Sequence, residues 1–170
     1  MIRAAALLAF LAGPAMAQDT AMLNQFARGL NKPAKLNAFS AAAAACLLGN
    51  GKTDDTAARF TKAGWAREDD TEMGVTTLTP TDGGVYVSLY DAGKICDVAS
   101  EVWGTEKAIG ALQVVAGGSG LALQSVDNAS TCDTYALSDQ ITVEITSSGN
   151  DPVCYSETTS TLRFTFADAS

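Results

Sequence analysis

The 170-residue chain carries eleven Lys and Arg side chains, nineteen Asp and Glu side chains and no histidine. The resulting net charge of −8 repels the phosphate backbone of nucleic acids, so we expect no nucleic-acid partner. Without histidine the chain lacks the commonest general base and metal ligand of proteins. This composition favours a non-enzymatic function, and nothing in the sequence indicates a cofactor.

The first residues are typical of a secretory signal peptide. A short positive segment with Arg3 precedes an apolar run from Ala4 to Gly13, and residues 15–17 form a cleavage motif of small residues. The apolar run is too short to cross a membrane, which takes about 20 residues. We therefore expect residues 1–17 to be removed. Residues 18–170 then form a single domain, periplasmic or secreted and free of the membrane, with a net charge of −9 once Arg3 is gone.

Four cysteines in an exported chain predict two disulfides, for which three pairings exist. We favour Cys46 with Cys96 and Cys132 with Cys154. The first bond would join a helix to a hairpin, and the second would join two neighbouring strands. In the chain-entropy account they contribute about 4 and about 3 kcal/mol. The alternative, a zinc site of four thiolates, is disfavoured because the cysteines occur singly and not in C-x-x-C pairs.

Helical periodicity and helix-stop residues predict three or four helices. The predicted segments are residues 19–30, 36–47, 53–65 and 105–118. Pro33 ends the first because proline cannot continue a helix. Thr53 is expected to be the N-cap of the third, with two aspartates in its first turn. Gly117 and Gly118 mark the end of the fourth.

Period-two alternation predicts a mainly antiparallel sheet of six or seven strands, and hence an α+β fold. The clearest hairpin pairs residues 85–90 with the segment from Ile95, through a turn at residues 91–94. Other predicted strands are residues 73–79, 120–126, 132–137, 140–146, 153–156 and 161–166. Residues 67–72, with the sequence REDDTE, are expected to form a charged loop.

Two hairpins of the chain have similar patterns. Residues 85–96 alternate in the same way as residues 141–154, and each follows a helix ending in Ala-Gly and then a strand. The similarity suggests a duplicated helix-plus-three-strand unit. The alternative is two unrelated hairpins within one antiparallel sheet.

Two hypotheses of function remain, and both are binding functions. Tyr86 and Tyr90 share a strand face, and with Trp103 nearby they would form a surface of the kind that protein interfaces favour. Under this hypothesis the protein is an interaction module with a protein partner; if the sheet is covered on both sides, the tyrosines are core residues instead. Under the second hypothesis the protein carries a small apolar ligand in a pocket between helices and sheet. That pocket would be lined by Phe39, Phe60, Trp65 and Phe164.

Overall fold

The structure is a computed structural model that describes residues 20–31, 35–127, 132–148 and 153–167. The predicted signal peptide lies outside these residues. Among the helices that are described, none is both long enough and apolar enough to span a membrane.

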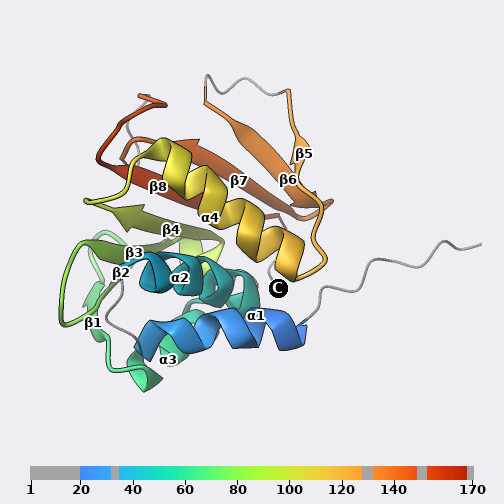
Figure 1. Cartoon of the computed structure of the whole chain (residues 1–170). Helices are drawn as coiled ribbons and strands as arrows, with labels where there is room; N and C mark the ends of the chain where they lie inside the picture. Colours follow the sequence, from blue (N-terminus) through green and yellow to red (C-terminus); the bar gives the residue numbers. More distant parts are fainter. Residues whose placement is uncertain (1–19, 32–34, 128–131, 149–152, 168–170) are drawn as a thin grey trace, which may run out of the picture.

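The fold is α+β, as the sequence predicts, with four α-helices packed on one antiparallel sheet (Figure 1). The sheet has eight strands, whereas the sequence predicts six or seven. The helices are α1 (Thr20–Ala27), α2 (Lys35–Gly49), α3 (Thr53–Lys62) and α4 (Thr105–Gly118), with short 3₁₀ turns η1 (Arg28–Asn31) and η2 (Asp91–Gly93). The strands are β1 (Ala66–Asp70), β2 (Val75–Thr79), β3 (Val85–Tyr90), β4 (Ile95–Ser100), β5 (Gln124–Ser125), β6 (Thr134–Ser138), β7 (Ile141–Thr146) and β8 (Ser160–Phe166).

The strand order β1-β2-β3-β4-β8-β7-β6-β5 divides the sheet into two halves with the same layout. In each half a helix is followed by four strands, and each successive strand lies closer to the centre of the sheet. Helix α3 precedes β1–β4, and α4 precedes β5–β8. The fourth strands, β4 and β8, pair antiparallel at the centre. The repeated arrangement is therefore a helix plus four strands. Within it β3 corresponds to β7, as the sequence predicts, but β4 corresponds to β8 and not to residues 153–156.

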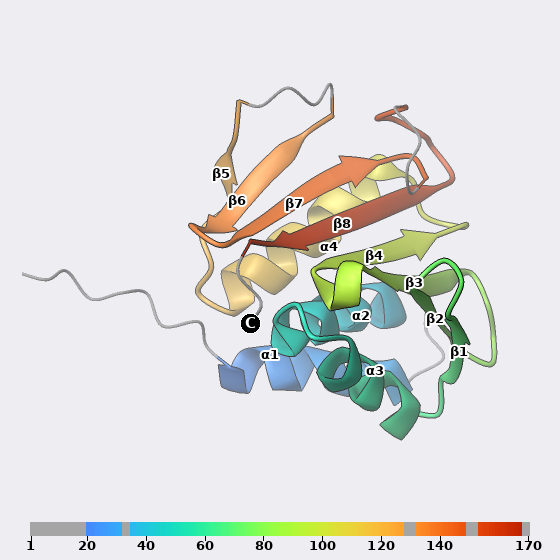
Figure 2. The same cartoon turned by 180° about the vertical axis from the view of Figure 1, so that it is seen from behind.

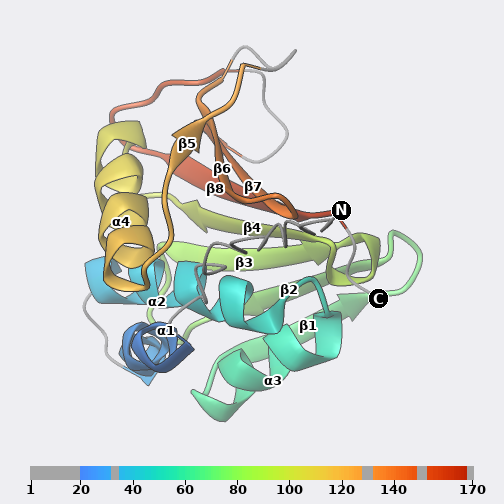
Figure 3. The ribbon, with the colours of Figure 1, turned by 90° about the vertical axis from the view of Figure 1, so that its right-hand side faces the viewer.

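All four helices lie on one face of the sheet, and the core fills the space between the two layers (Figure 3). The central helix α2 contacts α1, α3 and α4 as well as β3, β4 and β8. Its alanine run, residues 41–45, is buried on every side for that reason. Small side chains let neighbouring helices approach α2 closely, while larger residues such as Phe39 and Phe164 fill the space above the strands.

Helix α3 begins differently from the sequence prediction. Lys52 is its N-cap, with no side-chain cap hydrogen bond, and Thr53 is already helical, so the N-cap prediction for Thr53 is wrong. The Lys52 carbonyl accepts the backbone N–H of Thr56 at 3.0 Å and the Thr56 hydroxyl at 2.8 Å. The helix therefore starts at Thr53, one residue before the predicted start, and the Thr56 hydroxyl supplies the side-chain hydrogen bond of its first turn.

Two strand predictions are also wrong. The charged segment expected as a loop contributes β1, an edge strand paired with β2 along its whole length. Arg67 of this strand contacts Asp54 of α3 at 3.3 Å, so the strand is held by its charges as well as by its backbone. Residues 153–156 are not a strand. This extended segment instead binds the start of α4, where the Thr105 N–H donates to the Ser156 carbonyl at 2.9 Å.

Both predicted disulfides are confirmed. Cys46 of α2 bonds Cys96 of β4 within the core, which fixes the central helix to the middle of the sheet. Cys132, just before β6, bonds Cys154 in the connection between β7 and β8. Neither of these two cysteines lies within a strand, so the second bond joins two connecting segments and not two strands.

Candidate functional site

A groove of about 620 Å³ lies between α1 and α4 and has α2 as its floor. In Figure 1 these three helices lie on the face turned to the viewer. Most of its lining is apolar or small. The lining residues are Met22, Gln25, Phe26, Arg28, Gly29, Asn37, Ser40, Trp103, Lys107, Gly110, Ala111 and Val114.

Helices α1 and α4 run in opposite directions (Figure 1). The Phe26 ring packs against Gly118, the last residue of α4, so closely that a Cβ there would lie 2.8 Å from the ring. Gly29 packs against Asn37 of α2, with 3.1 Å between a Cβ position and the Asn37 carbonyl oxygen. Phe26 therefore lies at the C-terminal end of α4, and Lys107, in the first turn of that helix, is about 16 Å away along its axis.

Both charged side chains that line the groove are basic. Arg28 follows α1 directly, and Lys107 lies in the first turn of α4 with its Nζ 5.2 Å from the centre of the Trp103 ring. Among the described residues neither has a carboxylate within ion-pair distance. Lys107 also borders a smaller pocket with Glu106 and Glu157. The charged residues that line the groove are thus both cations, in a protein whose net charge is strongly negative.

The opposite face of the sheet carries Tyr86 and Tyr90. Figure 2 shows this face, with β8 and β7 in front of α4. Both tyrosines are half-buried, and Ser88 lies between them opposite Asp97. Burial is the main cause that raises the pKa of Tyr86, and the negative charge of Glu101 adds to it. The Tyr86 phenol is therefore a neutral donor at ordinary pH.

An ion pair crosses the centre of this face. Arg163 of β8 binds Asp97 of β4 through two parallel hydrogen bonds, Nε to Oδ1 at 2.9 Å and Nη2 to Oδ2 at 2.7 Å. These bonds are the main cause that raises the pKa of Arg163 above its ordinary value. The Asp97 side chain is only 4% exposed, so the pair joins the two halves of the sheet beneath a cover of neighbouring side chains.

The structure separates the three residues of the predicted binding surface. Tyr86 and Tyr90 lie on the open face of the sheet, because Val85, Val87 and Leu89, which alternate with them along β3, point to the helices. Trp103 lies on the helical side, in the groove. The three side chains therefore belong to two different surfaces, and a binding role for the tyrosines stays a prediction.

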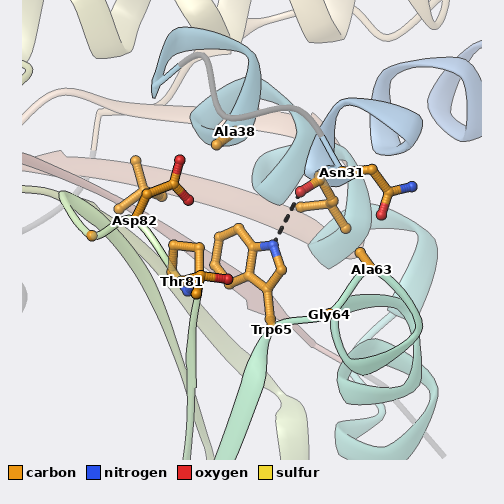
Figure 4. A pocket seen from close by; sticks show the side chains of 11 residues that line it. Asn31, Ala38, Ala63, Gly64, Trp65, Thr81 and Asp82 are labelled. Atoms are coloured by element: carbon orange, nitrogen blue, oxygen red, sulfur yellow. Dashed lines mark hydrogen bonds between the residues drawn. The ribbon is translucent and has the colours of Figure 1, made fainter.

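The aromatic residues expected to line a carrier pocket lie in the core instead. Phe39, Phe60 and Phe164 are fully buried. Trp65 packs edge-on against Phe60, with 4.9 Å between ring centres, and its indole N–H donates to the Leu30 carbonyl at 3.2 Å. It borders a crevice of about 120 Å³ closed by the turn around Asp82 (Figure 4). This volume is well below the several hundred Å³ of ligand sites.

The groove was missed at the sequence level because three helices and a loop contribute to it. Two signals point to it in retrospect. Trp103 and Lys107 are four residues apart at the start of a helix, a spacing that brings an aromatic ring and an ammonium group together. Gly110 interrupts a helix that is otherwise rich in apolar residues, and the space around it is open.

No side chains of the described residues group into a metal site. The comparisons with known proteins add no further indication of function, because the chain matches no protein-family model, no curated protein and no solved structure.

Proposed function

We propose that this is an exported, non-enzymatic protein that binds a small amphipathic ligand in the groove between α1 and α4. Its two disulfides are consistent with an exported protein. The observation that carries the proposal is the groove itself. Its volume of about 620 Å³ falls within the range of about 300 to 1,000 Å³ that is usual for small-molecule sites.

The lining of the groove fits binding better than catalysis. Val114 is 58% exposed on its rim, and Phe26 is half-buried beside it. A ligand that covers these side chains removes apolar surface from water, which contributes about 25 cal/mol of favourable free energy per Å² buried. The described lining residues include no carboxylate, thiol or imidazole, so Ser40 and Lys107, the lining side chains that could act as nucleophiles, have no carboxylate or imidazole base in the lining.

The experiment is a fluorescence titration with Nile red, a neutral apolar dye, against the mature chain and two leucine variants. Gly110→Leu places a side chain in the groove, and Gln113→Leu places the same side chain at an exposed position of the same helix outside the groove lining. We expect the dye to bind the wild type and Gln113→Leu, and to bind Gly110→Leu at least about tenfold more weakly. Equal binding to all three proteins, or no binding to any, would contradict the proposal.

A second candidate function is contact with a protein partner through the open sheet face. Tyr86 and Tyr90 favour it, because two half-buried tyrosines on one face supply rigid amphipathic contact area. The test is a photo-crosslinking residue at Thr165, which is exposed in the same cross-strand row as Tyr90. Crosslinks that disappear in Tyr90→Ala, and are absent with the crosslinker at Gln113 on α4, support this candidate. Equal crosslinking from both positions counts against it.

A further inference from the structure

The charges of the groove indicate which class of ligand it takes, an inference that rests on the binding function proposed above. Of the described basic side chains, Arg67 and Arg163 are neutralised by aspartates. Arg28 and Lys107 have no such partner among the described residues, and both line the groove. An apolar channel whose charged lining residues are both cations is complementary to an anionic group attached to an apolar chain.

We propose that the ligand is a free, single-chain anionic amphiphile, such as a fatty carboxylate. Its head group lies beside Lys107 and Trp103 at the start of α4, and its chain extends over Ala111 and Val114 toward Phe26. The side-chain amides of Gln25 and Asn37 also line the groove and supply neutral hydrogen-bond donors.

The α4 dipole acts in the same direction. Lys107 and Trp103 flank the N-terminal turn of α4, where the aligned peptide dipoles place partial positive charge. The dipole alone would not define a site. It adds to the field of Lys107, so that both contributions are positive at the end of the groove where α4 begins.

The overall charge of the protein indicates whether such a ligand binds from solution or from a membrane. The chain has a net charge of −8 before any cleavage, which repels the anionic surface of a lipid bilayer. A single anion that enters the groove is close to Lys107 and is screened by salt from the more distant carboxylates. We therefore assign the site to amphiphiles free in solution and not to the head groups of a membrane.

The test compares three probes with the same twelve-carbon chain, each below its micellar concentration, for their ability to displace Nile red. The probes are dodecanoate, dodecanol and dodecyltrimethylammonium. We expect dodecanoate to bind at least about tenfold more tightly than the cation, with dodecanol in between. The affinity for dodecanoate should fall as salt is added, and that for dodecanol should not.

Charge variants locate the head group. Lys107→Gln should weaken dodecanoate binding by about threefold and Arg28→Gln by less, and both should leave dodecanol binding unchanged. Lys52→Gln is the matched control, because Lys52 is an exposed lysine outside the groove with no ion pair among the described residues. It should change neither affinity.

The outcomes separate this inference from the binding function on which it rests. If the three probes bind with equal affinity and Gly110→Leu weakens them all, the groove binds apolar chains and the charge assignment is wrong. If no probe and no dye binds, both proposals fail. Binding of the protein to vesicles of anionic phospholipid, with no affinity for free dodecanoate, would overturn the assignment to free amphiphiles.

Discussion

The two halves of the sheet have the same strand layout but unequal helical cover. Strands β1–β4 lie under α2 and α3, with α1 packed on α2 as a further layer. Strands β7 and β8 are covered mainly by α4. Repetition of the strands without repetition of the helices leaves the side of α4 that faces α1 incompletely filled. The groove is located at this mismatch, which shows how an unequal cover on a symmetric sheet creates a concave surface.

The two disulfides also differ between the two halves of the sheet. Cys46–Cys96 lies in the core of the first half and ties α2 to β4, whereas Cys132–Cys154 ties connecting segments of the second half. The first half is therefore stabilised by buried packing around a covalent bond. The second half is stabilised by one helix and by a bond that restrains its loops.

Removal of the disulfides is expected to give the largest difference between the halves. The bonds close loops with sequence separations of 50 and 22 residues. Cys46→Ala/Cys96→Ala should lower the free energy of unfolding by about 4 kcal/mol, and Cys132→Ala/Cys154→Ala by about 3 kcal/mol, in urea unfolding. The first figure is a lower bound, because this variant also leaves a cavity in the core. A larger loss for the second variant would reverse the comparison.

The ion pair between the central strands tests whether the halves depend on each other. Arg163→Met leaves the nearly buried Asp97 carboxylate without its partner and should cost about 3 kcal/mol of stability. The double variant Asp97→Leu/Arg163→Met removes both charges and should recover most of that loss, as seen in thermal unfolding. If the double variant is no more stable than the single one, the bond is not the feature that joins the halves.

The glycines of α4 distinguish the open groove from the closed contact beside it. Gly110→Ala should stabilise the protein by about 0.5 to 1 kcal/mol, because alanine favours a helix and its Cβ meets only open space. Gly117→Ala, also in open space, is the control and should behave alike. Gly118→Ala should stabilise the protein by less, because the alanine Cβ would lie too close to the Phe26 ring. Equal gains at all three positions would show that α1 does not pack on α4 there.

A carboxylate of the first half gives the smallest expected effect. The hydroxyl of Thr76 donates to Asp69 at 2.6 Å, and this bond, followed by those from Arg67, lowers the pKa of Asp69. A lowered pKa in the folded state means that the charged form stabilises the fold above the ordinary pKa, and that this contribution is lost as pH falls through the lowered value. Thr76→Val should raise the pKa of Asp69 toward its ordinary value in an NMR titration. Thr77→Val, on the other face, should not.

The sequence predicts the central strands of each half well because these strands are buried on one face. Alternation in β3, β7 and β8 follows directly from the helices above them. The sequence prediction is wrong for β1, because its charged side chains are typical of a loop although its backbone pairs with β2. The prediction is also wrong for residues 153–156, because alternating side chains do not distinguish a strand from an extended segment that crosses a helix end.

The groove could not be predicted in the same way. Its lining depends on how α1, α2 and α4 pack, and helical periodicity gives the buried side of each helix without giving its neighbours. The sequence does contain the Trp103–Lys107 spacing and an internal glycine, but these signals acquire meaning only once these residues and Phe26 of α1 are known to line one groove.

The outer strands of the sheet have a consequence for the behaviour of the protein in a crowded compartment. An open sheet normally offers two unpaired edges on which other chains can form strands, the first step toward amyloid-like growth. Here one edge, β1, carries consecutive acidic residues at positions 68–70, and the other, β5, is two residues long. An incoming strand meets either like charges or almost no template. Neither edge therefore favours the addition of a further strand, and the sheet can remain open without closing into a barrel.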